Sequence, residues 1–240
     1  MATYSDDFYV SMEKGSHSSA QEIVPRLISR YSPQSVVDVG CGTGSFANEF
    51  LKLGISEVIG YEGLWMESLP TLLPKPNYRY HDLTESLFSS KEYDLCLCLE
   101  VAEHISESYA ENLIAILTSM SSVIVFSAAI PMQGGNHHVN EQWPEYWSKL
   151  FAARGFILEW DPRQSIWEND RIEACYRQNL LIYSKGHVNQ PVEPKALVHP
   201  NIWLAAMTIR KVPFWRKLIG KLPNFVFVFR RYLLKLLRAN

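Results

Sequence analysis

Short apolar runs rich in β-branched residues alternate along residues 1–186 with segments whose apolar positions recur at helical spacing. The runs predict buried strands, and the helical segments predict the helices that cover them. We expect strands at residues 36–39, 57–61, 77–80, 93–99, 122–126, 156–160 and 179–183. We expect helices at residues 16–31, 45–53, 107–120 and 144–154, with a loosely structured segment at residues 1–15.

Strands that alternate with helices predict an α/β fold with a doubly wound, mostly parallel sheet of seven strands, which binds its ligands at the carboxyl ends of the strands. This pattern ends near residue 186. Residues 187–201 are rich in proline and polar groups and are expected to form a linker. In residues 202–240, apolar side chains recur at helical spacing beside cationic ones, which predicts a tail of basic amphipathic helices.

The charge distribution separates the tail from the body. The chain has a net charge of −2, but the residues from Pro200 onward include nine Lys or Arg and no acid, which leaves 14 basic and 25 acidic groups before them. A basic, aromatic tail favours an anionic membrane surface as its partner. Docking on its own domain, or on a second copy of the chain in a homodimer, is the alternative. The acidic body argues against DNA or another polyanion.

Nothing in the sequence points to secretion or to a membrane span. The first ten residues, MATYSDDFYV, lack the basic and then apolar order of a secretory signal. No apolar run approaches the roughly 18 residues that a spanning helix needs. Four cysteines are present, and their spacing suggests no disulfide framework: Cys41, Cys96, Cys98 and Cys175. We therefore expect a cytoplasmic protein whose tail could hold it at the inner face of the cell membrane.

The first strand runs into a glycine turn in the stretch VVDVGCGTG, from Val36 to Gly44. A strand, a glycine turn and a helix together let backbone N–H groups closely approach a ligand. Asp38 stands where the strand ends, and an acid there disfavours a phosphate and suits a ligand with a cationic end. A bare G-x-G is common, but the full string D-V-G-C-G-T-G resembles motif I of the class I S-adenosylmethionine (SAM) methyltransferases.

The resemblance covers about residues 16–184. It implies SAM as the cofactor, with a contact after each successive strand. The residues expected to bind SAM are Asp38, Gly40, Cys41, Gly42 and Gly44 at the methionine end, Glu62 at the ribose hydroxyls, Asp82 and Leu83 near the adenine, and Leu99 at the end of the fourth strand. A nicotinamide dinucleotide is the alternative, but the glycine spacing differs from the G-x-G-x-x-G that binds a pyrophosphate.

Glu100, Glu103 and His104 form an E-x-x-E-H string directly after the fourth strand. If the segment turns helically, these three side chains cluster and could hold Mg²⁺ or Mn²⁺. The string resembles the metal-binding element of the ubiquinone-pathway catechol O-methyltransferases and of the methyltransferases that modify a 3′-terminal ribose of small RNAs. Many SAM methyltransferases carry the same string without a metal, and His104 would then pack or contact the substrate.

The polar loop after the fifth strand, QGGNHHVNEQW from Gln133 to Trp143, adds two histidines. In the RNA-modifying group a histidine three residues before a glutamate is the fourth metal ligand. The resemblance therefore implies His138, which precedes Glu141 by three residues, with His137 as the other choice. Without a metal, His138 or His104 would be the general base. A pair of surface histidines without a catalytic role is the remaining interpretation.

The string Y-R-Q-N-L at residues 176–180 and the histidine loop together resemble methyltransferases of bacterial surface-polysaccharide pathways. We assign no role to Tyr176, Gln178 or Asn179, whose polar pattern also fits hydrogen bonding in an edge strand. We expect an O-methyltransferase acting on a sugar hydroxyl of a glycan or glycolipid, which could be lipid-linked. The alternatives are a phenolic or quinone-like metabolite, a terminal ribose of RNA, or a membrane-attached SAM-binding regulator without turnover.

Overall fold

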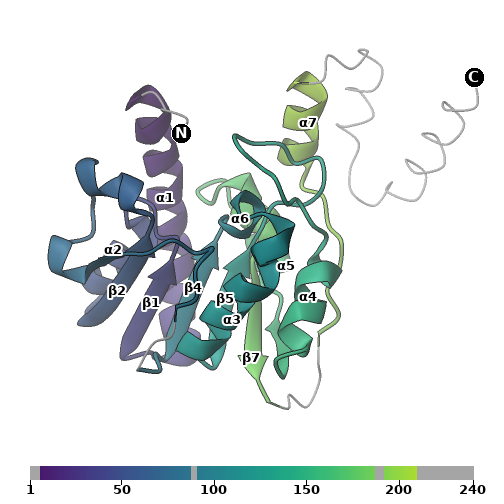
Figure 1. The fold of residues 1–240 in the computed structure, drawn as a ribbon. Coiled ribbons are helices and arrows are strands. Elements are labelled where there is room, and N and C mark those ends of the chain that lie inside the picture. Colours follow the sequence, from purple (N-terminus) through teal and green to yellow (C-terminus); the bar gives the residue numbers. More distant parts are fainter. Residues whose placement is uncertain (1–5, 88–90, 187–191, 210–240) are drawn as a thin grey trace, which may run out of the picture. The chain divides into compact units, whose positions relative to one another are not determined.

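The computed structural model describes residues 6–87, 91–186 and 192–209 (Figure 1). The chain divides into two units, residues 1–197 and 198–240. The first unit holds a seven-stranded sheet in the order β3-β2-β1-β4-β5-β7-β6. Its strands are β1 Ser35–Val39, β2 Glu57–Glu62, β3 Tyr78–Tyr80, β4 Leu95–Leu99, β5 Val123–Ser127, β6 Phe156–Trp160 and β7 Leu181–Lys185.

All strand pairs are parallel except those that β7 makes with β5 and β6. The strand order reverses at β1, which pairs with β2 on one side and with β4 on the other. Ligands of such sheets bind beyond the carboxyl ends of the strands at this reversal. The doubly wound, mostly parallel sheet expected from the sequence is thereby confirmed.

Helices cover both faces of the sheet because alternate residues of each strand point to opposite sides. Val36 of β1 belongs to a buried cluster with side chains of α1 (Asp6–Tyr31) and α2 (Ser45–Lys52). Its neighbour Val37 belongs to a second cluster with side chains of α3 (Ala110–Met120) and α4 (Pro144–Ala152). Cys96 and Cys98 are fully buried in this second cluster, which confirms them as packing residues.

Two element boundaries differ from the expected ones. Helix α1 begins at Asp6 rather than at residue 16, so it includes most of the segment that was expected to be loosely structured. The strand expected at residues 179–183 begins at Leu181, because residues Ala174–Asn179 form the short helix α6. Strand β7 is also an interior strand rather than an edge strand. The polar residues that end α6 turn inward to hydrogen-bond other elements, and a local pattern does not reveal such partners.

The end of the first unit is tied to the sheet. The backbone N–H of Val192 donates to the carbonyl of Leu158 in β6 at 3.1 Å. Arg163 of the short helix α5 (Arg163–Ile166) is fully buried and donates to the carbonyl of Lys195 at 2.9 Å. In addition, Nη2 of Arg163 lies 2.7 Å from a carboxylate oxygen of Asp161. A buried guanidinium paired in this way holds residues 192–195 against the domain.

The described part of the second unit contains helix α7, Pro200–Ile209, which begins just before the expected start of the tail. The helix has no charged side chain. The basic segments expected at residues 210–240 lie outside the described residues. Among the helices that the structure describes, none combines the length and the hydropathy that crossing a membrane requires.

Candidate active site

Asp38 is the second-last residue of β1, in register with Gly60 of β2 and Leu97 of β4. Its side chain is only 4% exposed. Burial, and secondly the nearby carboxylate of Glu62, raise the pKa of Asp38 to about 7. A cationic partner would stabilise the ionised form of this buried acid. The amino group of a bound amino acid moiety would be such a partner.

The glycine turn follows β1 and closely approaches its neighbours. The backbone N–H groups of Gly40 and Cys41 both donate to the carbonyl of Tyr61, at 2.8 and 3.1 Å. Gly40 and Gly44 have φ angles of 77° and 88°, and a β-carbon at these positions would collide with Val101 and Leu73 respectively. Only glycine combines this backbone with this proximity. Gly44 also precedes the first residue of α2, so the turn leads directly to a helix N-terminus.

Glu62 ends β2 and faces the glycine turn. Its carboxylate accepts the N–H groups of Gly42 and Gly63, both at 2.8 Å. Burial raises the pKa of Glu62, and these two hydrogen bonds lower it in part. The carboxylate therefore lies against the backbone of the glycine turn, and its contact with a ribose stays a prediction.

The remaining expected SAM contacts also follow strand ends. Asp82 comes two residues after β3 and is exposed. Its Oδ1 accepts hydrogen bonds from the backbone N–H of Thr84 at 2.8 Å and from the Thr84 hydroxyl at 2.7 Å. These bonds lower the pKa of Asp82. Leu83 is buried, and Leu99 is the buried last residue of β4. All the residues expected to bind SAM thus lie in or after β1, β2, β3 and β4 at their carboxyl ends.

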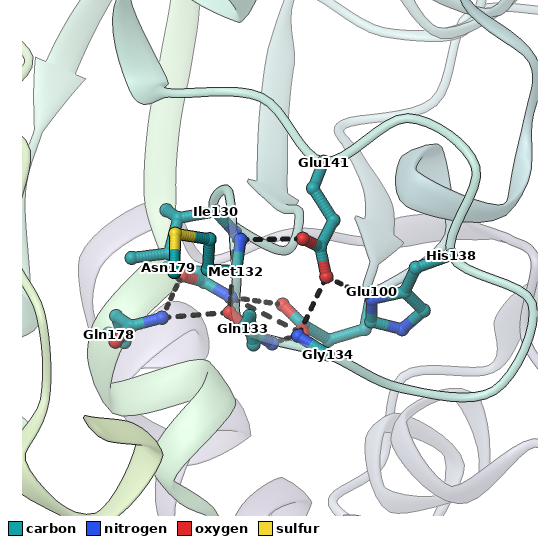
Figure 2. A network of polar contacts seen from close by, with 9 residues as sticks. All are labelled: Glu100, Ile130, Met132, Gln133, Gly134, His138, Glu141, Gln178 and Asn179. Carbon is teal, nitrogen blue, oxygen red and sulfur yellow. Dashed lines mark hydrogen bonds and ion pairs between the residues drawn. The ribbon is translucent and has the colours of Figure 1, made fainter. Parts of the chain in front are cut away.

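Glu100 follows β4 with a left-handed backbone, at a φ of 54°. Its N–H donates to the carbonyl of Ser127, which ends β5. Asn179 Nδ2 donates to its carboxylate at 3.0 Å, and Gln133 Nε2 does so at 3.1 Å (Figure 2). Burial raises the pKa of Glu100, and the bond from Asn179 is the largest opposing effect. The left-handed residue directs this carboxylate toward α6.

Glu103, His104 and His138 form one group, in which the candidate ligand atoms all lie within 4.8 Å of one another. The two imidazole rings meet edge to face with their centroids 4.9 Å apart. Glu100, the other expected ligand, does not belong to this group. Residues 102–104 form a single 3₁₀ turn that begins after Glu100, so the expected helical clustering of all three E-x-x-E-H side chains does not occur.

Glu103 is the buried member of the group, with 1% of its side chain exposed. Neither of its carboxylate oxygens has a partner with good hydrogen-bond geometry, although the backbone of Ala129 and the carboxylate of Glu100 lie close enough to affect its pKa. Burial and the nearby carboxylate of Glu100 raise its pKa well above the usual range. The pKa of His104 is lowered by burial and by His138. Both shifts reduce the local charge of the group.

The loop between β5 and α4 brings His138 to this group. Its residues Val139 and Asn140 donate their N–H groups to the carbonyl of Glu103 at 2.8 and 3.0 Å. The carboxylate of Glu141 contacts Nδ1 of His138 at 3.0 Å (Figure 2). A carboxylate only accepts, so Nδ1 carries a proton, which in a neutral imidazole leaves the lone pair on Nε2. His137 is exposed with a left-handed φ of 60°, and its ring is not part of the group.

Comparison with known protein families identifies the fold. Residues 14–166 match the family described as "Methyltransferase domain". The chain belongs to this family. It is a SAM-dependent methyltransferase, which excludes the nicotinamide dinucleotide considered above as the alternative cofactor. Among curated proteins, none matches the chain.

Solved structures of methyltransferases share the fold of this chain. The SAM-bound amino pentose methyltransferase CalS10 from Micromonospora echinaspora, which is involved in calicheamicin biosynthesis, has a TM-score of 0.56 and 16% identity over 78% of this chain and 99% of its own. DesVI from Streptomyces venezuelae has a TM-score of 0.55 and 15% identity, with coverages of 75% and 96%. The methyltransferase domain of bacterial CtHen1-C has a TM-score of 0.53 and 15% identity, with coverages of 72% and 100%.

Four residues of the methyltransferase site have roles that the sequence did not predict. Glu141 was noted only for its spacing from His138, and Gln133, Gln178 and Asn179 were assigned no role. All four act through hydrogen bonds to residues that are distant in the sequence or through backbone groups. The spacing of Glu141 from His138 was the one local signal that pointed to such a contact.

Proposed function

We propose that this methyltransferase transfers the methyl group of SAM to a sugar hydroxyl, assisted by a divalent cation that Glu103, His104 and His138 hold. The observation that carries the cation is the buried carboxylate of Glu103, which has no partner with good hydrogen-bond geometry and lies next to two imidazoles. Leaving a carboxylate buried without a partner is costly, and a cation would remove that cost. A mixed oxygen and nitrogen set suits Mg²⁺ or Mn²⁺ under cellular availability.

The residues in and around the group of Glu103, His104 and His138 have different roles in the reaction. A bound cation would supply positive charge that favours loss of the acceptor's hydroxyl proton. With the cation bound, Nε2 of His138 would hold it, while Glu141 keeps Nδ1 protonated and fixes the ring. Without a cation, the same Nε2 would be the base that accepts the hydroxyl proton. His104 and Glu103 orient the acceptor oxygen. Asp38 and Glu62 hold the amino acid and ribose ends of SAM, so most of the catalysis is positional.

The loop that carries His138 supports a sugar as the acceptor. Trp143 is 40% exposed at the end of this loop, and Tyr109, which follows the turn of His104, is 43% exposed. Aromatic faces stack on the C–H surface of a sugar. The amino pentose acceptor in the name of CalS10 is in line with a sugar. We propose a glycan or glycolipid acceptor, which a lipid anchor would place at the membrane.

The tail supports action at a membrane surface. Helix α7 is apolar and uncharged over ten residues, and all nine basic residues of this region follow it in the sequence. Such a segment favours an anionic lipid surface, where each Lys or Arg adds about 1 kcal/mol to binding. We propose that the protein is cytoplasmic and peripheral at the inner face of the cell membrane.

Titration of the full-length chain with Mn²⁺ by calorimetry tests the cation. We expect binding of one ion by the wild type, a loss of at least about tenfold in affinity in Glu103→Gln, and no change in Glu107→Gln, an exposed glutamate nearby. Binding of S-adenosylhomocysteine should persist in all three proteins. Equal Mn²⁺ affinity in wild type and Glu103→Gln would overturn the cation site.

Methyl transfer itself is tested with SAM labelled in its methyl group and a lipid extract that contains glycolipids. We expect labelled sugar methyl ethers, whose formation stops with a chelator and resumes with Mn²⁺. Label that appears instead in phenolic or quinone products, or in RNA, would contradict the sugar acceptor. The absence of any transfer to all of these would favour a regulator without turnover.

A further inference from the structure

Helix α6 ends in two buried amide side chains that the reaction described above does not use. Gln178 is fully buried and Asn179 is 4% exposed. Both belong to a helix of six residues, between the loop at residues 167–173 and strand β7. Buried amides are retained only where their hydrogen bonds are satisfied, so their partners indicate their purpose.

The NH₂ groups of these two amides donate within the active site, namely to Gln133, Asn179 and Glu100. Gln178 Nε2 donates to Oε1 of Gln133 at 2.8 Å and to Oδ1 of Asn179 at 3.0 Å. Asn179 Nδ2 donates to Gln133 Oε1 at 3.0 Å and to the Glu100 carboxylate at 3.0 and 3.3 Å. Each NH₂ group carries two protons, so these contacts use the donor capacity of both amides.

Gln133 connects this network to the loop of His138. Its own N–H donates to the carbonyl of Ile130. Its neighbours Met132 and Gly134 donate their N–H groups to the Glu141 carboxylate, both at 2.7 Å. The same carboxylate holds Nδ1 of His138. Figure 2 shows that the turn at residues 132–134 lies between the two sets of contacts, with Glu141 on one side and the amides of α6 on the other.

We propose that Gln178 and Asn179 are positioning residues: through Gln133 they fix the turn at residues 132–134, and thereby the imidazole of His138 beside Glu103 and His104. The network is closed, so neither amide has a donor left for a substrate. A fully satisfied buried network holds one arrangement of its members. Asn179 also donates to Glu100, which follows strand β4. The two amides therefore join the acceptor loop to the end of this strand.

The test uses the full-length chain with Asn179→Asp, which keeps the shape but replaces the donor by a carboxylate facing Glu100. The matched control is Asn169→Asp, because Asn169 also donates to a glutamate, Glu22, at 2.9 Å. Three measurements are made on each protein: the ¹⁵N signals of the His138 ring, which report its tautomer, the affinity for Mn²⁺, and the affinity for S-adenosylhomocysteine. The Mn²⁺ measurement rests on the proposed function, and the ring signals do not.

In Asn179→Asp we expect altered or doubled His138 ring signals and Mn²⁺ affinity about tenfold lower, with affinity for S-adenosylhomocysteine within about twofold of wild type. The control should match wild type in all three. If Asn179→Asp does not fold, Gln178→Met, which removes two donors without adding charge, replaces it. Unchanged ring signals in the folded variant would overturn the proposal. Failure of the wild type to bind Mn²⁺ would overturn only the cation site, because the ring signals still decide the positioning role.

Discussion

The imidazole of His138 lies directly over the backbone of Gly135, where a β-carbon would collide with its Nε2 and Cε1 atoms. Gly135 does not have the positive φ that excludes other residues. A side chain at this position is therefore excluded by steric collision with His138 and not by the backbone conformation. The position of the ring that completes the Glu103, His104 and His138 group depends on this one missing methyl group.

Gly135→Ala should displace the His138 ring with little backbone strain. We expect the affinity for Mn²⁺ to fall about tenfold or more, while the melting temperature changes by only a few degrees. Gly54→Ala is the opposite control, because Gly54 has open space around it but a φ of 95°. That variant should lose about 1 kcal/mol of stability and keep its Mn²⁺ affinity. The reverse pattern, measured by calorimetry and thermal unfolding, would disprove the packing role of Gly135.

Asp38 should make cofactor binding depend on pH. Its pKa is raised from 3.8 to about 7, so the folded protein without ligand binds this proton more tightly than the unfolded chain does. The stability due to this proton is present at pH values below the unfolded pKa, and it is lost as the pH rises toward about 7. The ionised form, which pairs with a cationic amino group, dominates only above that pH.

We therefore expect the affinity for S-adenosylhomocysteine to rise between about pH 5.5 and pH 7.5, with most of the increase near the raised pKa of Asp38. Asp38→Asn cannot ionise and should bind more weakly with a flatter pH profile. Calorimetry at several pH values measures both. A wild-type affinity that is constant over this range would show that Asp38 does not pair with the ligand.

Glu62 should contribute to the affinity for the cofactor and have no direct role in methyl transfer. Two charge-assisted hydrogen bonds to a ribose are worth about 1.5–3 kcal/mol each, offset by the loss of its present bonds to Gly42 and Gly63. We expect Glu62→Ala to weaken binding of S-adenosylhomocysteine about tenfold to a hundredfold. Glu57→Ala, at the exposed start of the same strand, is the control and should bind normally. Equal affinities in the two variants would contradict the ribose contact.

Removal of residues 198–240 tests the tail, because the first unit ends at Leu197. The full chain should sediment with vesicles that contain anionic lipid, and less so at about 0.5 M salt, where surface charges are strongly screened. The shortened chain should remain in solution and still bind S-adenosylhomocysteine. If the shortened chain unfolds or a dimer dissociates instead, the tail docks on protein and the membrane proposal is wrong.

The local sequence of this protein determined the fold class and the order of its elements. A buried strand needs a short apolar run, and a glycine turn needs particular backbone angles, so both leave marks within a few neighbouring residues. The stretch from Val36 to Gly44 could therefore be recognised, and Glu62 could be placed at the end of the next strand. The family match agrees with the interpretation of the glycine turn, and Glu62 does end β2.

Only the tertiary structure decided how the chemical groups meet. Glu100 has a left-handed φ of 54° that no spacing rule predicted, and its carboxylate accepts from Asn179 and lies outside the group of Glu103, His104 and His138. The sequence pattern around Gln178 and Asn179 fitted a strand. In the structure both residues end α6, and their amides contact Gln133. Such contacts depend on how separate elements pack, because a hydrogen bond between distant residues imposes no periodicity on either segment.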